Sequence, residues 1–327
     1  MSSFNSAVSP NATIVRPPFF FVSGFSNIPH VKYYYIFMCF VYAVTVLGNS
    51  FIMLIIYMDR NLHTPKYVIV FHLAVVDLCS STALIPKFID TFLFDNQLIA
   101  FEACLANFFF VQCFTFMQSL TLILLAYDRF IAICFPLKYH VIITNVAMVV
   151  ILAVLWTLSS GLVIAAVVFM TRLSFCKSIV INSYYCDYGP MFRLACNDNS
   201  PNYIISIMGI TIMFVGALVL IVATYVCIIF ALLKIASAEE RLRAMKTCTS
   251  HLIVVALFYL PISSIYIAAI VTIVPPNVRI ISTSLSYTIP PMLNPIIYTL
   301  KTEEIVQAIQ KLFKRVKVIK PEVNQYQ

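Results

Sequence analysis

Long apolar stretches, free of Asp, Glu, Lys and Arg, dominate this sequence of 327 residues. A helix crosses a bilayer core of about 30 Å with about 20 consecutive apolar residues. Stretches of this kind lie at 33–58, 103–127, 141–171, 199–233, 247–278 and 280–300. A further stretch, 67–92, contains Asp77, Lys87 and Asp90 but is otherwise strongly apolar. The pattern therefore predicts seven membrane-spanning helices.

The length of these runs also indicates the fold class. Backbone amides in hydrocarbon must form their hydrogen bonds within a helix or in a closed barrel. Uninterrupted apolar runs lack the alternation of barrel strands, so we expect an all-α fold. Residues 33–300 would form one seven-helix bundle, residues 1–32 an extracellular segment, and residues 301–327 a cytoplasmic amphipathic helix and tail.

The segment that follows the last span has a helical pattern of apolar positions. Ile305, Ala308, Ile309 and Leu312 recur at steps of three and four residues, which places them on one face of a helix. We expect a short helix on the inner leaflet, held by this face and by attraction to anionic lipid. The alternative is a solvated tail.

Composition and charge support a membrane location and indicate an orientation. The chain is 61% hydrophobic and 10% charged, whereas soluble domains are roughly 25% charged. With the N-terminus outside, 14 of the 21 Lys and Arg residues fall on the cytoplasmic side, where such an excess is expected. We therefore expect a multi-pass plasma-membrane protein, and we interpret the net charge of +8 as a membrane-facing surface and not as a nucleic-acid site. Asn11, in the Asn-Ala-Thr sequon, is then a candidate for glycosylation.

The distribution of cysteines agrees with this orientation. Cys104, Cys176, Cys186 and Cys196 fall on the predicted outer side, where an oxidising compartment permits disulfides. Three of them lie in one loop, near 172–200, which we expect to form a stapled lid. Four cysteines allow three pairings, and spacing alone does not choose among them.

The third span ends in a charged pair, Asp128 and Arg129. From Cys104 to Arg129 the chain advances 25 residues, or about 37 Å in a helix, so Cys104 lies at the outer end and Arg129 at the inner end. Such a pair at the mouth of a membrane helix is costly unless it is partnered or wetted, which favours a functional role. A pair that merely snorkels to the interface is the alternative.

The residues around this pair carry a family resemblance. Residues 126–134, Ala-Tyr-Asp-Arg-Phe-Ile-Ala-Ile-Cys, resemble the inner third-helix signature of odorant receptors, a branch of the rhodopsin-like G-protein-coupled receptors. Other matching segments follow the family's order: 48–49 (Gly-Asn), 62–65 (Leu-His-Thr-Pro), 73–78 (Leu-Ala-Val-Val-Asp-Leu), 136–140 (Pro-Leu-Lys-Tyr-His), 246–252 (Lys-Thr-Cys-Thr-Ser-His-Leu) and 291–298 (Pro-Met-Leu-Asn-Pro-Ile-Ile-Tyr). Lys66, His72 and Phe130 depart from the usual pattern and suggest a fish-type branch.

The resemblance implies specific pairings and a polar cluster. It pairs Cys104 with Cys186 and Cys176 with Cys196. It also gathers four intramembrane residues around a small ion or water cluster: Asn49, Asp77, Ser119 and Asn294. A charge at Asp77 is unfavourable without polar company, so sodium is a hypothesis there. A neutral Asp77 satisfied by hydrogen bonds is the competing interpretation.

The resemblance also implies a signalling mechanism. Asp128, Arg129 and Tyr298 would form the switch that couples to a heterotrimeric G protein, of the stimulatory olfactory type, which raises cyclic AMP. Pro261 and Pro295 remove hydrogen bonds within helices and kink them, which suits a lever. The expected location is the cilia of olfactory sensory neurons, and no cofactor is expected.

For the ligand we expect inward-facing residues in the outer halves of the third, fifth, sixth and seventh helices. The candidates are Val111, Gln112, Thr115, Tyr259, Ser263, Tyr266 and Tyr287, although each taken singly could be ordinary core packing. Amine-hormone receptors carry an acid at the position of Val111, so a biogenic amine is not expected. A mostly apolar lining suits a small, apolar or weakly polar odorant.

Other classes of protein fit the sequence less well. A retinal protein needs a lysine in the last span, and 280–300 contains none. A transporter would show internal repeats and broken midplane helices, and neither is visible. A peptide or hormone receptor of the same fold stays open. The sequence has no catalytic constellation, so we do not expect an enzyme.

Overall fold

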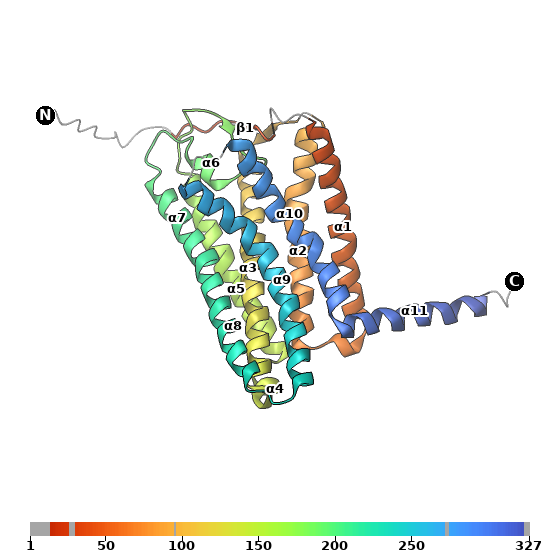
Figure 1. The fold of residues 1–327 in the computed structure, drawn as a ribbon. Helices are drawn as coiled ribbons and strands as arrows, with labels where there is room; N and C mark the ends of the chain where they lie inside the picture. Colours follow the sequence, from red (N-terminus) through yellow and green to blue (C-terminus); the bar gives the residue numbers. More distant parts are fainter. Residues whose placement is uncertain (1–13, 26–29, 95, 272–274, 324–327) are drawn as a thin grey trace.

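The computed structural model describes residues 14–25, 30–94, 96–271 and 275–323, and its core is a bundle of long helices (Figure 1). These are α1 (Val31–Met58), α2 (Pro65–Leu93), α3 (Phe101–Cys134), α5 (Asn145–Met170), the continuous span of α7 (Ser200–Ile210), a π-helical turn (Thr211–Gly216) and α8 (Ala217–Leu233), then α9 (Ala238–Val271) and α10 (Pro276–Lys301).

The apolar character of these helices matches a membrane bundle. Among the described residues, six helices are long and apolar enough to cross a bilayer. The seventh, α10, is more polar and contains Pro290, Pro291 and Pro295, yet it packs against α1, α2 and α9 inside the bundle. The predicted all-α, seven-helix fold is confirmed.

The two ends of the bundle carry different small elements. One end, here called the sheet end, holds β1 (Phe19–Val22), β2 (Leu98–Ala100), β3 (Val180–Ile181) and the short helix α6 (Tyr188–Phe192). The opposite end, called the α11 end, holds the turns Arg60–Leu62 and Pro136–Lys138, the short helix α4 (Tyr139–Ile142) and α11 (Glu303–Val323). Figure 1 shows α11 leaving the bundle crosswise to α10.

The small sheet joins three segments that are far apart in the sequence. Its strand order is β2-β1-β3, and β1 runs antiparallel to β2 and parallel to β3. Phe20, on the central strand, is fully buried and packs against the rings of Phe101 and Phe175. The N-terminal segment is thereby bound across the end of the bundle. The sequence pattern did not predict this sheet.

Several helix boundaries differ from the expected ones, most of all the start of α9. α9 begins at Ala238, before the predicted start at 247, because the helix continues past the apolar window into a charged turn. Glu239 and Glu240 lie in that first turn, where the helix dipole favours acidic groups. α11 extends over 21 residues, longer than the short helix expected.

α11 is attached to the bundle by its apolar face and by two ion pairs. Ile305 is fully buried. Glu304 lies 3.5 Å from the Lys66 ammonium on α2, and Lys311 lies 3.2 Å from Asp59. Ion pairs of this kind add little free energy when exposed, so the buried face supplies most of the attachment and the pairs fix the direction of the helix.

His72, which departs from the family pattern, connects three helices. The indole Nε1 of Trp156 on α5 donates to His72 Nε2 at 2.8 Å. An indole only donates, so His72 must carry its proton on Nδ1, 3.2 Å from Thr121 Oγ1 on α3. The histidine therefore acts as a polar connection among α2, α3 and α5.

Gly48 on α1 lies against Pro295 of α10. A Cβ at this position would lie 2.8 Å from Pro295 Cγ, and overpacking of this kind is destabilising. We expect Gly48→Val to lower the melting temperature of the purified protein in detergent by several degrees. Gly161→Val on α5 is the matched control, because no atom lies within 4 Å of its Cβ position. An equal loss in both variants would contradict this packing argument.

Candidate functional site

A cavity of about 370 Å³ lies among the helices at the sheet end. It is bounded by α3, α5, α7, the π-helical turn, α9, α10 and the loop that contains α6. Aromatic and aliphatic side chains make up much of its wall: Phe108, Phe116, Leu162, Val163, Phe192, Phe214 and Ile262. Its size and lining are those of a site for a small molecule.

The predicted ligand residues are distributed unevenly around this cavity. Gln112 on α3 and Tyr287 on α10 line it. The other predicted ligand residues are not among the described residues that line the cavity. Thr115 is buried and donates to the backbone oxygen of Val111, which is also buried, and the Tyr259 hydroxyl hydrogen-bonds with that of Ser119 at 2.7 Å.

Two further candidates lie on α9. Ser263 is half-buried on the turn that follows Pro261. Tyr266 also belongs to α9, but its side chain lies outside the described part of the structure, as does Asn11, the glycosylation candidate. The ligand set therefore stays a prediction beyond Gln112 and Tyr287, and for those two only the position in the wall is established.

Three charged side chains that are not expected from the sequence also line the cavity. They are Asp187 and Arg193 from the loop around α6, and Arg279 from the first turn of α10. Burial raises the pKa of the Asp187 carboxyl, although the charges of Arg279 and Arg193 act in the opposite direction. One signal was available in the sequence, since Asp187 follows directly on the lid cysteine Cys186.

The lid over this cavity is cross-linked. Cys104, at the start of α3, is bonded to Cys186, and Cys176 is bonded to Cys196 within the loop. These are the pairings that the family resemblance implies. Asn107 on α3 also accepts a hydrogen bond from the backbone N–H of Cys186, so the loop is fixed to α3 beside the cavity.

A polar cluster lies at the middle of the bundle around the fully buried Asp77. The two carboxylate oxygens of Asp77 accept hydrogen bonds from Gln118 Nε2 at 2.8 Å and from Asn294 Nδ2 at 2.7 Å. Asn49 Nδ2 donates to the backbone oxygen of Pro291 and joins α1 to α10. The adjoining cavity measures about 10 Å³, which is about the volume that one water requires.

Ser119 is expected in this cluster from the family resemblance, whereas Gln118 is not. In the structure the Ser119 hydroxyl pairs with Tyr259, while Gln118, one position earlier, faces Asp77. A third-helix residue thus contacts the carboxylate, as the family resemblance implies, but it is an amide and not a hydroxyl. Sodium at Asp77 stays a hypothesis, and signalling that is unchanged across a wide range of sodium concentrations would contradict it.

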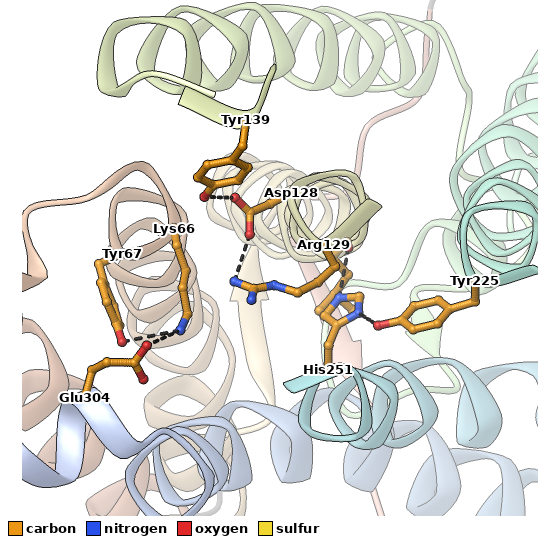
Figure 2. A network of polar contacts seen from close by, with 9 residues as sticks. Lys66, Tyr67, Asp128, Arg129, Tyr139, Tyr225, His251 and Glu304 are labelled. Atoms are coloured by element: carbon orange, nitrogen blue, oxygen red, sulfur yellow. Dashed lines mark hydrogen bonds and ion pairs between the residues drawn. The ribbon is translucent and has the colours of Figure 1, made fainter. Parts of the chain in front are cut away.

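The charged pair on α3 has a further partner at the α11 end (Figure 2). Arg129 Nη2 lies 2.8 Å from one oxygen of Asp128, and the Tyr139 hydroxyl donates to the other at 2.9 Å. The Asp128 side chain is fully buried and that of Arg129 is 14% exposed. Burial and the Asp128 carboxylate raise the pKa of Tyr139, so its hydroxyl stays a proton donor. The short helix α4 therefore helps to hold Asp128 and Arg129 in contact.

A second polar link ties α9 to its neighbours close to Arg129. His251 Nε2 lies 3.1 Å from the backbone oxygen of Leu122 on α3, and the Tyr225 hydroxyl lies 2.7 Å from His251 Nδ1. A carbonyl only accepts, so His251 carries its proton on Nε2 and accepts from Tyr225. Figure 2 shows this link beside the Arg129 side chain.

These groups surround a cavity of about 450 Å³ at the α11 end. Its wall includes Arg129, His251 and Tyr298, together with Lys66 on α2 and Lys246 on α9. Asp128 is absent from the described wall because it is turned toward α4. The structure thus brings two of the three predicted switch residues, Arg129 and Tyr298, to one opening between helices.

Comparison with known proteins gives consistent matches over most of the chain. The model of the family described as olfactory receptor matches residues 38–316. Human olfactory receptor 51F2 is 36% identical over 304 residues, covering 92% of this chain and 89% of that receptor. Mouse olfactory receptor 1M1 is 35% identical over 285 residues, covering 86% and 89%. Squid rhodopsin is similar in fold, with a TM-score of 0.70 at 19% identity, covering 89% of this chain and 88% of that one.

Proposed function

Because the chain belongs to the olfactory receptor family of G-protein-coupled receptors, we propose that it binds a small odorant in the sheet-end cavity and activates a stimulatory G protein through the α11-end cavity. Membership of this family makes it an odorant-sensing, multi-pass membrane receptor and not an enzyme, as the sequence predicted. We propose, beyond family membership, the location of the ligand, the class of the G protein and the direction in which the chain is inserted in the membrane.

The observation that carries the proposal is that the same three helices line both cavities. α3 contributes Gln112 to one and Arg129 to the other, and α10 contributes Tyr287 and Tyr298. α9 contributes Ile262 at the sheet end and His251 at the α11 end, with Pro261 inside the helix between them. A proline within a helix permits a bend, so a ligand beside Ile262 can bias the position of the far end of α9.

The orientation follows from the same assignment. The sheet end, with its two disulfides, would face the oxidising exterior, since disulfides persist there. The α11 end would face the cytoplasm, and the basic, amphipathic α11 would lie on the inner leaflet against anionic lipid. In an olfactory neuron the receptor would reside in the ciliary membrane.

Activation would be a shift between two populations of conformers. An odorant moves the equilibrium only if it binds the open conformer more tightly than the closed one. In the structure, the closed contacts are those of Arg129 with Asp128 and of His251 with Leu122. Their release would widen the α11-end cavity for a helix of the G protein α subunit, and the G protein would then raise cyclic AMP.

The His251 link gives a test of this mechanism. We expect His251→Ala to raise ligand-independent cyclic AMP several-fold, because the variant loses both the contact with α3 and the contact with Tyr225 that hold α9 in place. The measurement is basal cyclic AMP at matched surface expression. His140→Ala, on the exposed face of α4, is the control. A basal level at or below that of the control would argue against a restraining role.

The direct test of the function is a cyclic AMP reporter screen with a chemically diverse odorant panel, in cells with and without the stimulatory olfactory α subunit. We expect responses to a few small molecules that disappear without this subunit. Responses only to peptides would favour the alternative of a peptide or hormone receptor. Responses that persist without the subunit would contradict the proposed coupling.

A further inference from the structure

The charged side chains that line the sheet-end cavity have a net positive charge. Two guanidinium groups, those of Arg193 and Arg279, and one carboxylate, that of Asp187, line the cavity. The formal sum is +1. Charges in a site partly withdrawn from water interact more strongly than charges in bulk solvent, so the cavity favours a guest that carries a negative charge.

Arg279 is the better placed of the two cations. It is half-buried in the first turn of α10, and its Nη2 donates to the backbone oxygen of Asn182 at 2.9 Å. No carboxylate oxygen of the described residues lies within 4.0 Å of this guanidinium. Because a guanidinium has five N–H donors, Arg279 is anchored by one and keeps others for a ligand. Arg193 is exposed and contacts the Tyr203 hydroxyl at 3.5 Å.

The remainder of the cavity is apolar. Phe116 on α3, Phe214 in the π-helical turn and Ile262 on α9 line its wall, and all three are buried. Gly209 leaves room beside Phe116, because a Cβ there would lie 3.6 Å from the Phe116 ring. A guest would thus meet hydrocarbon along most of its length and charge at one end.

We propose, on the basis of the function proposed above, that the ligand is a small monocarboxylate with a hydrocarbon tail. Its carboxylate pairs with the guanidinium of Arg279, and its tail lies against Phe116, Phe214 and Ile262. A planar guanidinium can bind a carboxylate through two parallel hydrogen bonds. The volume of about 370 Å³ suits a short-chain or medium-chain acid. The net positive charge of Asp187, Arg193 and Arg279 in the wall disfavours amines.

The test measures binding apart from signalling. Purified receptor in detergent is heated with acetate, butanoate, hexanoate or octanoate at neutral pH, and with hexan-1-ol, hexanamide and hexylamine as matched neutral and cationic compounds. A ligand that binds the folded state raises the melting temperature. We expect one or more of the acids to do so at concentrations about tenfold or more below those at which the alcohol, amide and amine act, as one charge-assisted contact implies.

Substitutions then assign the contact to Arg279. Arg279→Gln should weaken stabilisation by the acid about tenfold or more and leave that by the alcohol unchanged, while Arg279→Lys should retain part of the preference. Arg172→Gln is the matched control, because Arg172 lies against the Phe169 ring, outside the described wall of the cavity. If Arg279→Gln does not yield folded protein, Arg279→Lys decides: its acid affinity must fall relative to its affinity for the alcohol.

Several outcomes would overturn the inference. They are a preference for the alcohol, amide or amine, equal stabilisation of the wild type and Arg279→Gln by the acid, or no stabilisation by any acid of the series. A cyclic AMP response to neutral odorants would in that case leave the receptor function standing. Conversely, binding of the acid through Arg279 without any cyclic AMP response would uphold this inference and contradict the proposed coupling.

Discussion

Arg129→Ala should abolish odorant-stimulated cyclic AMP and still allow the receptor to reach the cell surface. The side chain lies at the α11-end cavity, pairs with Asp128 and is 14% exposed. Its removal takes the guanidinium out of the opening that we assign to the G protein, so we expect the response to fall to background. Cyclic AMP and surface staining of the same cells provide the measurement.

Arg60→Ala is the matched control for this substitution. Arg60 is an exposed arginine in the turn between α1 and α2, so its loss removes the same charge from the same end of the bundle without affecting the cavity. A full response in the Arg129 variant would refute the assignment of the switch. Loss of surface staining in that variant alone would instead indicate a role in folding.

The second large effect concerns the bridge between α3 and the lid. Cys186→Ser should remove most of the receptor from the cell surface, because it leaves Cys104 unpaired and frees the loop that closes the sheet end. The bridge spans 82 residues of sequence, and both cysteines are buried. Losing such a bridge typically costs about 2–4 kcal/mol, a large part of the free energy of unfolding of an ordinary protein. Surface staining against total expression measures the effect.

Cys227→Ser separates this effect from a general sensitivity to loss of cysteine. Cys227 is a free, exposed cysteine on α8, and we expect its serine variant to reach the surface normally. Normal surface staining together with a normal odorant response in Cys186→Ser would show that the bridge is dispensable and would contradict the prediction.

The membrane helices could be predicted because each depends on local composition alone. The span 33–58, for example, corresponds to Val31–Met58 in the structure, since lipid admits a long apolar segment only as a helix. The pair Asp128 and Arg129 could likewise be placed by counting helical rise from Cys104. The position of a residue along one helix follows from the sequence. The end of the bundle at which that residue lies could therefore be predicted as well.

Features that depend on contacts between distant segments could not be predicted in this way. β1 is a run of four residues, Phe19–Val22, too short to signal a strand when its partners lie in two remote loops. The partnership of Tyr139 with Asp128 requires the connection after α3 to fold back on that helix. Which helical face meets a cavity is equally non-local. Gln112 was predicted as a lining residue, whereas Arg279 was not.

The small sheet at the sheet end of the bundle can form only late in the synthesis of the chain. β1 cannot complete its hydrogen bonds until β3, about 160 residues later in the chain, has been synthesised. Until then one edge of β1 stays unpaired, and Cys104 has no Cys186 to bond with. Unpaired strand edges are prone to association, and partly folded chains are those that chaperones retain. A nascent receptor that stalls before this loop would therefore present both an open edge and a reactive thiol to the retention machinery, which makes completion of the loop a natural checkpoint for export.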